Sequence, residues 1–155
     1  MKFSVSKRFS RPSLWFKGAV LLFFIFLFAS CKTIATYQET TFVQTSELKA
    51  RTLVLMDHAT EDYADFSEQV DNVLIAAEKL YAMQKAREKN TITIQQWKVL
   101  MEQKVPATNQ TLLPGFFRMW KNKKVLSQYF VEQAHEQIAD TFDEILKLES
   151  RKLKY

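Results

Sequence analysis

The chain has 155 residues, 47% of them hydrophobic, with two glycines, three prolines and one cysteine. A single thiol excludes an intramolecular disulfide, a thiolate zinc cluster and a C-x-x-C redox centre. Few turn-forming residues argue against a β fold with many hairpins. We therefore expect an all-α protein, a small antiparallel bundle of about four or five helices behind an N-terminal signal or anchor helix.

The first element in chain order is a basic segment followed by an apolar one. Residues 1–17 carry five basic and no acidic side chains, Gly18 to Ala29 are uninterrupted apolar residues, and Ser30 precedes Cys31. These are the three parts of a secretory signal. The apolar run would cover only roughly 18 Å of a bilayer core about 30 Å thick. We therefore expect residues 1–30 to be a cleaved signal peptide.

The end of this segment, Leu27–Cys31 (LFASC), resembles the lipobox of bacterial lipoproteins, although Phe28 stands where that family most often has leucine. The resemblance implies cleavage by signal peptidase II and a diacylglycerol thioether on Cys31, usually with N-acylation. Lys32 is not the aspartate that retains many such lipoproteins at the inner membrane, which favours the outer membrane of a Gram-negative cell. An ordinary signal or an uncleaved anchor is the alternative.

The formal net charge of +5 comes entirely from the predicted signal peptide. When its five basic residues are taken from the 22 in the chain, 17 remain against 17 acidic residues. A balanced remainder lacks the basic field typical of nucleic-acid binding, and we expect no nucleic-acid partner.

Residues 31–45 are predicted to be an acylated cysteine and a flexible tether; the alternative for the part near Phe42 and Val43 is that it packs on the domain. Residues 32–45 could hold that domain, residues 46–155, up to roughly 45 to 50 Å from a bilayer. Between residues 46 and 88 apolar residues recur at helical spacing. They are Leu48, Leu55, Ala59, Tyr63, Phe66, Val70, Val73, Ala77 and Leu80.

A break in this helical segment is possible near residue 59. Thr60 is followed by Glu61 and Asp62, and an oxygen acceptor followed by acids is typical of a helix N-terminus. The segment is therefore either one kinked helix or two helices.

Three further helices are expected after it. Thr93 to Gln96 fits a capping box with Ile92 and Trp97 as the hydrophobic staple, and it predicts a helix to about Gln103. Pro114 can open a short helix through Trp120. Ser127 is expected to cap a final helix to about Lys152, with its apolar face formed by Val131, Ala134, Ile138, Phe142, Ile145 and Leu153.

Two segments, GFFRMWKNKKVLS and FDEILKLES, are similar to small uncharacterised helical lipoproteins of Gram-negative bacteria. The similarity covers about the last third of the chain. It implies a helical domain and supplies no catalytic residues.

Motifs for catalysis or metal binding are weak. The sequence from Glu132 to His135 has the E-x-x-H spacing of di-iron bundles, but the second such motif that those sites need is missing. Asp57, His58, Glu61 and Asp62 are more typical of an ion-paired face than of a cation site. Hydrolase, phosphate-loop and dinucleotide motifs are also missing, so we expect no enzyme, metal or cofactor.

Three other features are candidates for function. His135 lies within the apolar stripe of the final helix, either as a partly buried histidine with a polar neighbour or as part of a ligand pocket or a pH-sensitive element. The ligand pocket would be lined by Trp97, Trp120 and His135. Glu149 lies in the same stripe, where we expect the bundle to open to solvent. An interaction surface for anionic membranes is formed by Phe116, Phe117, Arg118, Trp120, Lys121, Lys123 and Lys124, unless these aromatics cover the end of the bundle.

Two classes of function remain. In the first, the protein is a non-enzymatic, membrane-tethered interaction or structural module of the envelope, with an envelope protein or lipid as partner. In the second, the bundle is a periplasmic binding protein or sensor that holds a small ligand or metal between its helices.

Overall fold

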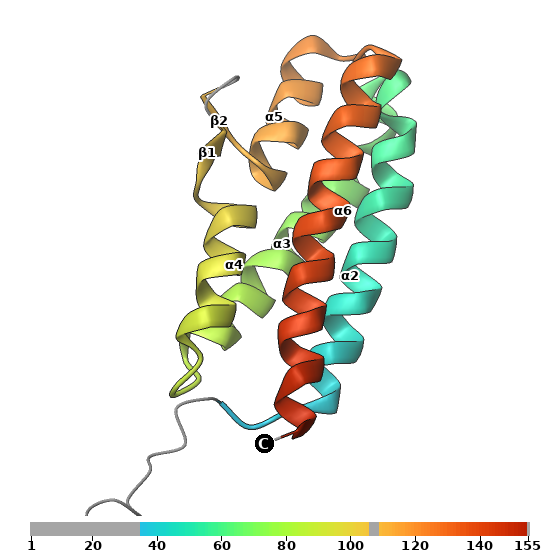
Figure 1. The fold of residues 1–155 in the computed structure, drawn as a ribbon. Helices are drawn as coiled ribbons and strands as arrows, with labels where there is room; N and C mark the ends of the chain where they lie inside the picture. Colours follow the sequence, from blue (N-terminus) through green and yellow to red (C-terminus); the bar gives the residue numbers. More distant parts are fainter. Residues whose placement is uncertain (1–34, 106–108, 155) are drawn as a thin grey trace, which may run out of the picture. The chain divides into compact units, whose positions relative to one another are not determined.

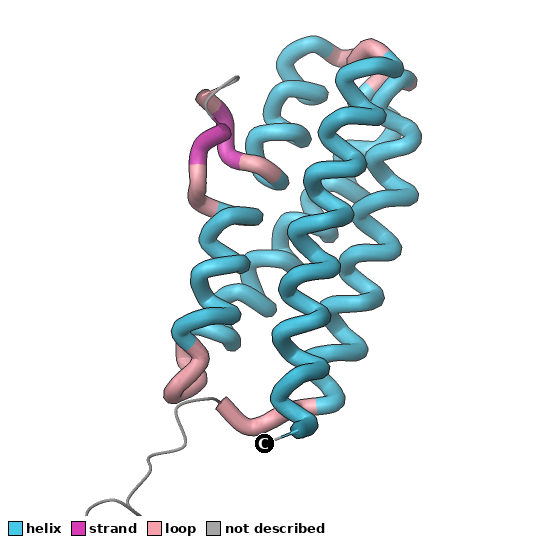
Figure 2. The backbone as a smooth tube through the Cα atoms, viewed as in Figure 1, coloured by secondary structure: helices cyan, strands magenta, loops and turns pink. Residues whose placement is uncertain are grey.

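The computed structural model describes residues 35–105 and 109–154. The predicted signal peptide, Cys31 and the first residues of the predicted tether lie outside these residues. Within the described ranges the chain forms five α-helices and one small hairpin, which confirms the all-α expectation (Figures 1 and 2). The elements are α2 (Glu39–Asp57), α3 (Ser67–Lys85), α4 (Thr91–Met101), β1 (Lys104–Val105), β2 (Gln110–Thr111), α5 (Leu113–Lys123) and α6 (Gln128–Arg151).

The helices form an antiparallel bundle in which one position is shared by two short helices. Figure 1 shows α2 running antiparallel to both α3 and α6, and α4 and α5 running one after the other in the same direction. Packing contacts join α6 to α2 and α4, and α3 to α2, α4 and α5. The antiparallel pair β1 and β2, with Lys104 opposite Thr111, is inserted between α4 and α5. This insertion separates α4 from α5.

The predicted break near residue 59 is confirmed as two separate helices. After α2 ends, short 3-10 turns at His58–Thr60 and Tyr63–Phe66 lead into α3. The Asp62 carboxylate accepts a hydrogen bond from the Ala64 backbone N–H at 2.9 Å, so Asp62 rather than Thr60 caps the second turn.

The bundle begins earlier than the predicted boundary at Ser46, because α2 starts at Glu39. The prediction of a flexible tether is therefore wrong for residues 39–45. Thr41, Thr45 and Thr52 are buried on the same face as Leu48. The Thr45 hydroxyl donates a hydrogen bond to the Thr41 backbone carbonyl at 2.8 Å. Because the hydroxyl has this partner within its own helix, Thr45 can be buried as a small residue between helices.

The prediction of a capping box at Thr93 is wrong. Helix α4 begins at Thr91 after Asn90 and ends at Met101, short of the expected Gln103; Thr93 is buried inside its first turns. Ile92 is 62% exposed, so it does not pack against the buried Trp97 as a staple. Asn90 precedes the helix without capping it, because its side chain bonds to other residues described below.

The last two helices follow the sequence prediction more closely. Pro114 lies in the first turn of α5, which continues beyond Trp120 to Lys123. The Ser127 hydroxyl accepts from the Phe130 backbone N–H at 3.4 Å and caps α6 as predicted. Leu153 is 65% exposed and does not belong to the apolar face, because the chain changes to a 3-10 turn at Lys152–Lys154 and the helical spacing is lost.

Two buried tryptophans organise the core. Trp97 on α4 stacks at 6.1 Å on Tyr81 and meets Phe142 edge-on at 6.5 Å, both measured between ring centroids. Trp120 on α5 packs against Tyr63, Phe66 and Phe117. Within the described ranges, no helix has the length and apolar character needed to cross a membrane.

Candidate functional site

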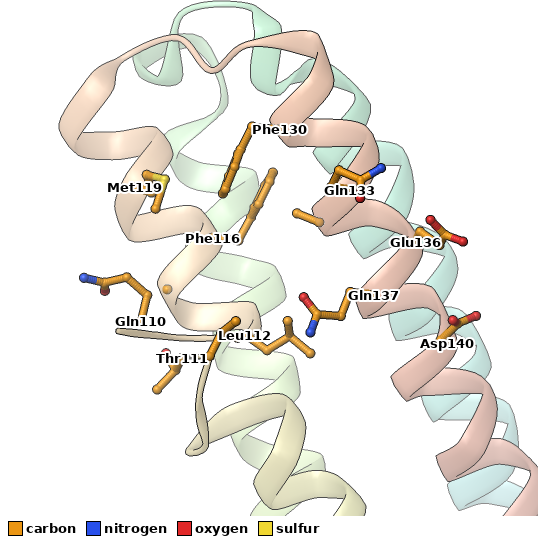
Figure 3. A pocket seen from close by; sticks show the side chains of 13 residues that line it. Gln110, Thr111, Leu112, Phe116, Met119, Phe130, Gln133, Glu136, Gln137 and Asp140 are labelled. Atoms are coloured by element: carbon orange, nitrogen blue, oxygen red, sulfur yellow. The ribbon is translucent and has the colours of Figure 1, made fainter. Parts of the chain in front are cut away.

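A pocket of about 370 Å³ opens between α6 on one side and the hairpin with α5 on the other (Figure 3). The volume lies at the lower end of the range for small-ligand sites, which is roughly 300 to 1,000 Å³.

The floor of the pocket is apolar and aromatic. Phe116 of α5 and Phe130 of α6 lie with their rings nearly parallel, 6.1 Å apart between centroids. Val105, Leu112 and Met119 complete this floor. Phe116 is buried and Phe130 is half-buried, so a ligand would find a firm aromatic surface that requires little reorganisation.

The α6 side of the pocket is polar. Gln133, Glu136, Gln137 and Asp140 fall at spacings of three and four, so they share one face of this helix and line the pocket. Glu136 and Asp140 are exposed, and neither forms an ion pair within the described part of the chain. The pocket therefore combines an aromatic floor with two uncompensated negative charges at its rim.

A glycine allows the hairpin to approach α5. Gly115 is buried, and a Cβ added to it would lie 2.7 Å from the Gln110 Cβ and 3.2 Å from the Gln110 carbonyl carbon. Both atoms belong to or adjoin the backbone of β2. An alanine at this position would therefore have to move the hairpin wall of the pocket.

We expect Gly115→Ala to destabilise the fold by about 1 to 3 kcal/mol, the usual cost of overpacking, although alanine is otherwise the better helix former. Urea denaturation of the purified protein measures this change. Asn122→Ala, at an exposed position of the same helix, should leave stability unchanged or slightly raised. A Gly115→Ala protein as stable as the Asn122→Ala protein would show that the close approach is not maintained.

A second polar cluster is buried at the end of the bundle where α6 terminates. The Glu149 carboxylate is fully buried and accepts from the Arg87 guanidinium at 3.3 Å and from the Lys152 ammonium at 2.5 Å. Lys152 also donates to the Asn90 side-chain oxygen at 2.6 Å, and the Asn90 amide donates to the Gln84 side-chain oxygen at 2.8 Å. The cluster joins the end of α3, the start of α4 and the end of α6.

Burial also shifts the pKa of one member of this cluster. Desolvation lowers the pKa of Lys152 below its ordinary value and Arg87 adds to this, although Glu149 opposes it by stabilising the charged ammonium. Because the Glu149 carboxylate is fully buried, the expectation that it lies where the bundle opens to solvent is wrong. Its position in the apolar stripe reflects a buried carboxylate with two cationic partners.

The predicted interaction surface on α5 is divided by the fold. Phe116, Phe117 and Trp120 are buried in the core, whereas the cations Arg118, Lys121, Lys123 and Lys124 are exposed. The prediction that these aromatics and cations together form a membrane interface is therefore wrong. The burial of the three aromatics agrees with the alternative, in which they cover the end of the bundle.

The predicted ligand pocket of Trp97, Trp120 and His135 does not form. Each tryptophan packs in its own aromatic cluster, and the Trp120 indole N–H donates to the Glu61 backbone carbonyl at 3.0 Å. His135 is half-buried and lies 3.7 Å from the Asp57 carboxylate, which fits the reading of a histidine with a polar neighbour.

The polar residues considered for metal binding have partners of their own. His58 and Glu61 approach to 2.7 Å, and Glu132 accepts from the Gln128 amide at 2.9 Å. Across the described ranges, no three His, Cys, Asp or Glu side chains come together in an arrangement suited to a metal ion. Cys31, the predicted lipid attachment site, lies outside the described residues.

The polar wall of the α5–α6 pocket and the partners of Glu149 were not found from the sequence. Gln133, Glu136, Gln137 and Asp140 have the spacing of an ordinary solvated helix face, so their pattern carries no signal for a pocket. An acid inside the apolar stripe at Glu149 was such a signal, and its partners came from residues far away in the chain.

Comparison with protein-family models, curated proteins and solved structures gave no significant match.

Proposed function

We propose that this chain is a lipid-anchored, non-enzymatic interaction module of a Gram-negative cell envelope, held on the outer membrane through Cys31. In this proposal the α5–α6 pocket receives a partner protein, and the recognised element is a lysine- or arginine-bearing segment with a neighbouring apolar side chain.

The pocket is the single observation that carries the binding role. Aromatic rings of Phe116 and Phe130 suit the aliphatic stem of a long basic side chain, and Glu136 and Asp140 suit its charged end. Charge complementarity of this kind raises the association rate and fixes orientation.

Support for the anchor comes from the sequence LFASC and from chemistry of the modification. Each buried CH₂ of an acyl chain contributes about 0.8 kcal/mol, so a diacylglycerol with an additional N-acyl chain would hold the protein at the membrane effectively permanently. The intact mass of protein from the membrane fraction tests this. Loss of residues 1–30 with added acyl mass, absent from Cys31→Ala, is expected; an unprocessed mass would contradict the anchor.

The binding role is tested by crosslinking in intact cells. A photoreactive amino acid replacing Gln137 should give defined crosslinked partners, and these should disappear when Glu136→Lys and Asp140→Lys are combined. The matched control combines Glu132→Lys and Glu144→Lys, which makes the same charge change on exposed positions of α6 outside the pocket. Equal crosslinking in both variants would reject the pocket as the site.

A second candidate is a small-ligand site in the same pocket, favoured by its size and aromatic floor. An amphiphilic amine would satisfy both walls. Native mass spectrometry of the purified protein and thermal shifts with a panel of aliphatic and aromatic amines would detect it. A ligand-free mass together with no thermal shift would reject the small-ligand site, and the protein segment would remain as the proposed occupant.

A further inference from the structure

The chain enters the described domain at one defined end of the bundle. Ala35 is buried, and its backbone N–H donates to the Lys89 carbonyl at 3.0 Å. The Arg87 guanidinium donates to the Thr36 carbonyl. Figure 1 shows the start of α2, the α3–α4 connection and the C-terminus at this same end. We call it the entry end.

The distance between a lipid on Cys31 and the entry end is short. Four residue steps separate Cys31 from Ala35, and an extended chain of that length spans at most about 14 Å. This is far less than the 45 to 50 Å that a tether to residue 45 would allow, because α2 begins at Glu39 and Ala35 is already packed.

The exposed side chains of the entry end combine apolar and basic groups. Three apolar side chains are exposed there: Met83 (41%), Ile92 (62%) and Leu153 (65%). Met83 lies in the last turn of α3, Ile92 in the first turn of α4 and Leu153 in the C-terminal 3-10 turn. The cations Lys89, Arg151 and Lys154 are exposed in the segments at this end, and so are two acids, Glu39 and Glu88. Apolar side chains at headgroup depth and cations facing phosphates are what an anionic bilayer surface attracts.

We infer that the entry end of the bundle rests on an anionic membrane surface, with Met83, Ile92 and Leu153 at headgroup depth and Lys89, Arg151 and Lys154 facing lipid phosphates. The inference rests on the proposed anchor at Cys31. The ion cluster of Arg87, Glu149 and Lys152 holds this end of the bundle together, so the membrane meets a firm surface. The C-terminal turn of α5, which carries Lys121 and Lys123, lies at the opposite end of the bundle (Figure 1).

The test uses full-length protein that a Gram-negative host has processed and acylated, reconstituted in vesicles of phosphatidylethanolamine and phosphatidylglycerol that carry nitroxide-labelled lipids. The acylated Cys31 sulfur cannot react, so a fluorophore attaches only to an introduced cysteine, either Ile92→Cys or Lys121→Cys. Helix α6, with 24 residues, is roughly 36 Å long. We expect strong quenching of the probe at position 92 and none at position 121.

A pair of charge variants tests the role of the cations. Lys89→Glu, Arg151→Glu and Lys154→Glu combined should abolish quenching at position 92. Lys121→Glu, Lys123→Glu and Lys124→Glu combined make the same charge change at the opposite end and should leave it unchanged. Equal quenching at both probe positions, or no difference between the two triple variants, would overturn the inference.

The intact mass of the same sample separates this inference from the anchor. Acylated protein with an unquenched probe at position 92 would reject the entry end as the membrane contact and leave the anchor in place. Protein without acyl groups would reject both.

Discussion

Replacing Glu149 by leucine should destabilise the protein by about 3 to 5 kcal/mol, one of the largest effects expected of any single substitution in the bundle. The carboxylate is fully buried between Arg87 and Lys152. Without it two cations would remain close together at a buried site, where desolvation already lowers the pKa of Lys152. Urea denaturation followed by circular dichroism measures the change.

The control for this experiment lies on the same helix. Glu144 pairs with Lys147 at 2.7 Å, but both side chains are about half exposed, and Glu144→Leu should cost no more than about 1 kcal/mol. If Glu149→Leu were as stable as Glu144→Leu, the buried ion cluster would contribute nothing to holding the ends of α3, α4 and α6 together.

Replacing Trp120 by alanine should cost about 3 to 5 kcal/mol, because the largest side chain of α5 is fully buried and the cavity would not refill. Its ring packs against Tyr63 and Phe66 in the connection between α2 and α3. Its indole N–H also donates to the Glu61 carbonyl at 3.0 Å. Thermal unfolding monitored by near-ultraviolet circular dichroism would report the loss.

Phenylalanine substitutions separate packing from hydrogen bonding. Trp120→Phe retains an aromatic ring but leaves the Glu61 carbonyl without this donor, a further cost of about 1 kcal/mol. The Trp97 indole N–H is buried and has no hydrogen-bond partner among the described residues, so Trp97→Phe removes no bond seen there. We therefore expect Trp97→Phe to be the milder change, and the reverse order would contradict the assigned contact.

The two proposed surfaces are compatible within one molecule. If the entry end rests on the membrane, the hairpin and the start of α5, which line the α5–α6 pocket, lie further from the bilayer than the entry end does (Figure 1). A tethered protein would then present Glu136 and Asp140 to partners in the surrounding compartment rather than to lipid.

The all-α class, the break near residue 59, the proline at the start of α5 and the Ser127 cap of α6 were all predictable from the sequence. Each depends on residues within a few positions of one another, where periodicity and side-chain capping act directly. The start of α2 was missed because threonine is a weak helix former. The burial of Thr41 and Thr45 depends on packing against other helices of the bundle, which their local sequence does not reveal.

Tertiary structure alone decided the position of the polar groups. Asn90 does not cap α4 because its side chain bonds to Gln84 and to Lys152, which lies 62 positions further along the chain. The α5–α6 pocket is lined by the hairpin, α5 and α6 together, and at Gly115 the hairpin approaches α5 too closely for a Cβ to fit. Contacts between distant segments form only once the helices are packed, so local sequence patterns predict the helices and leave the buried ion cluster and the pocket to the fold.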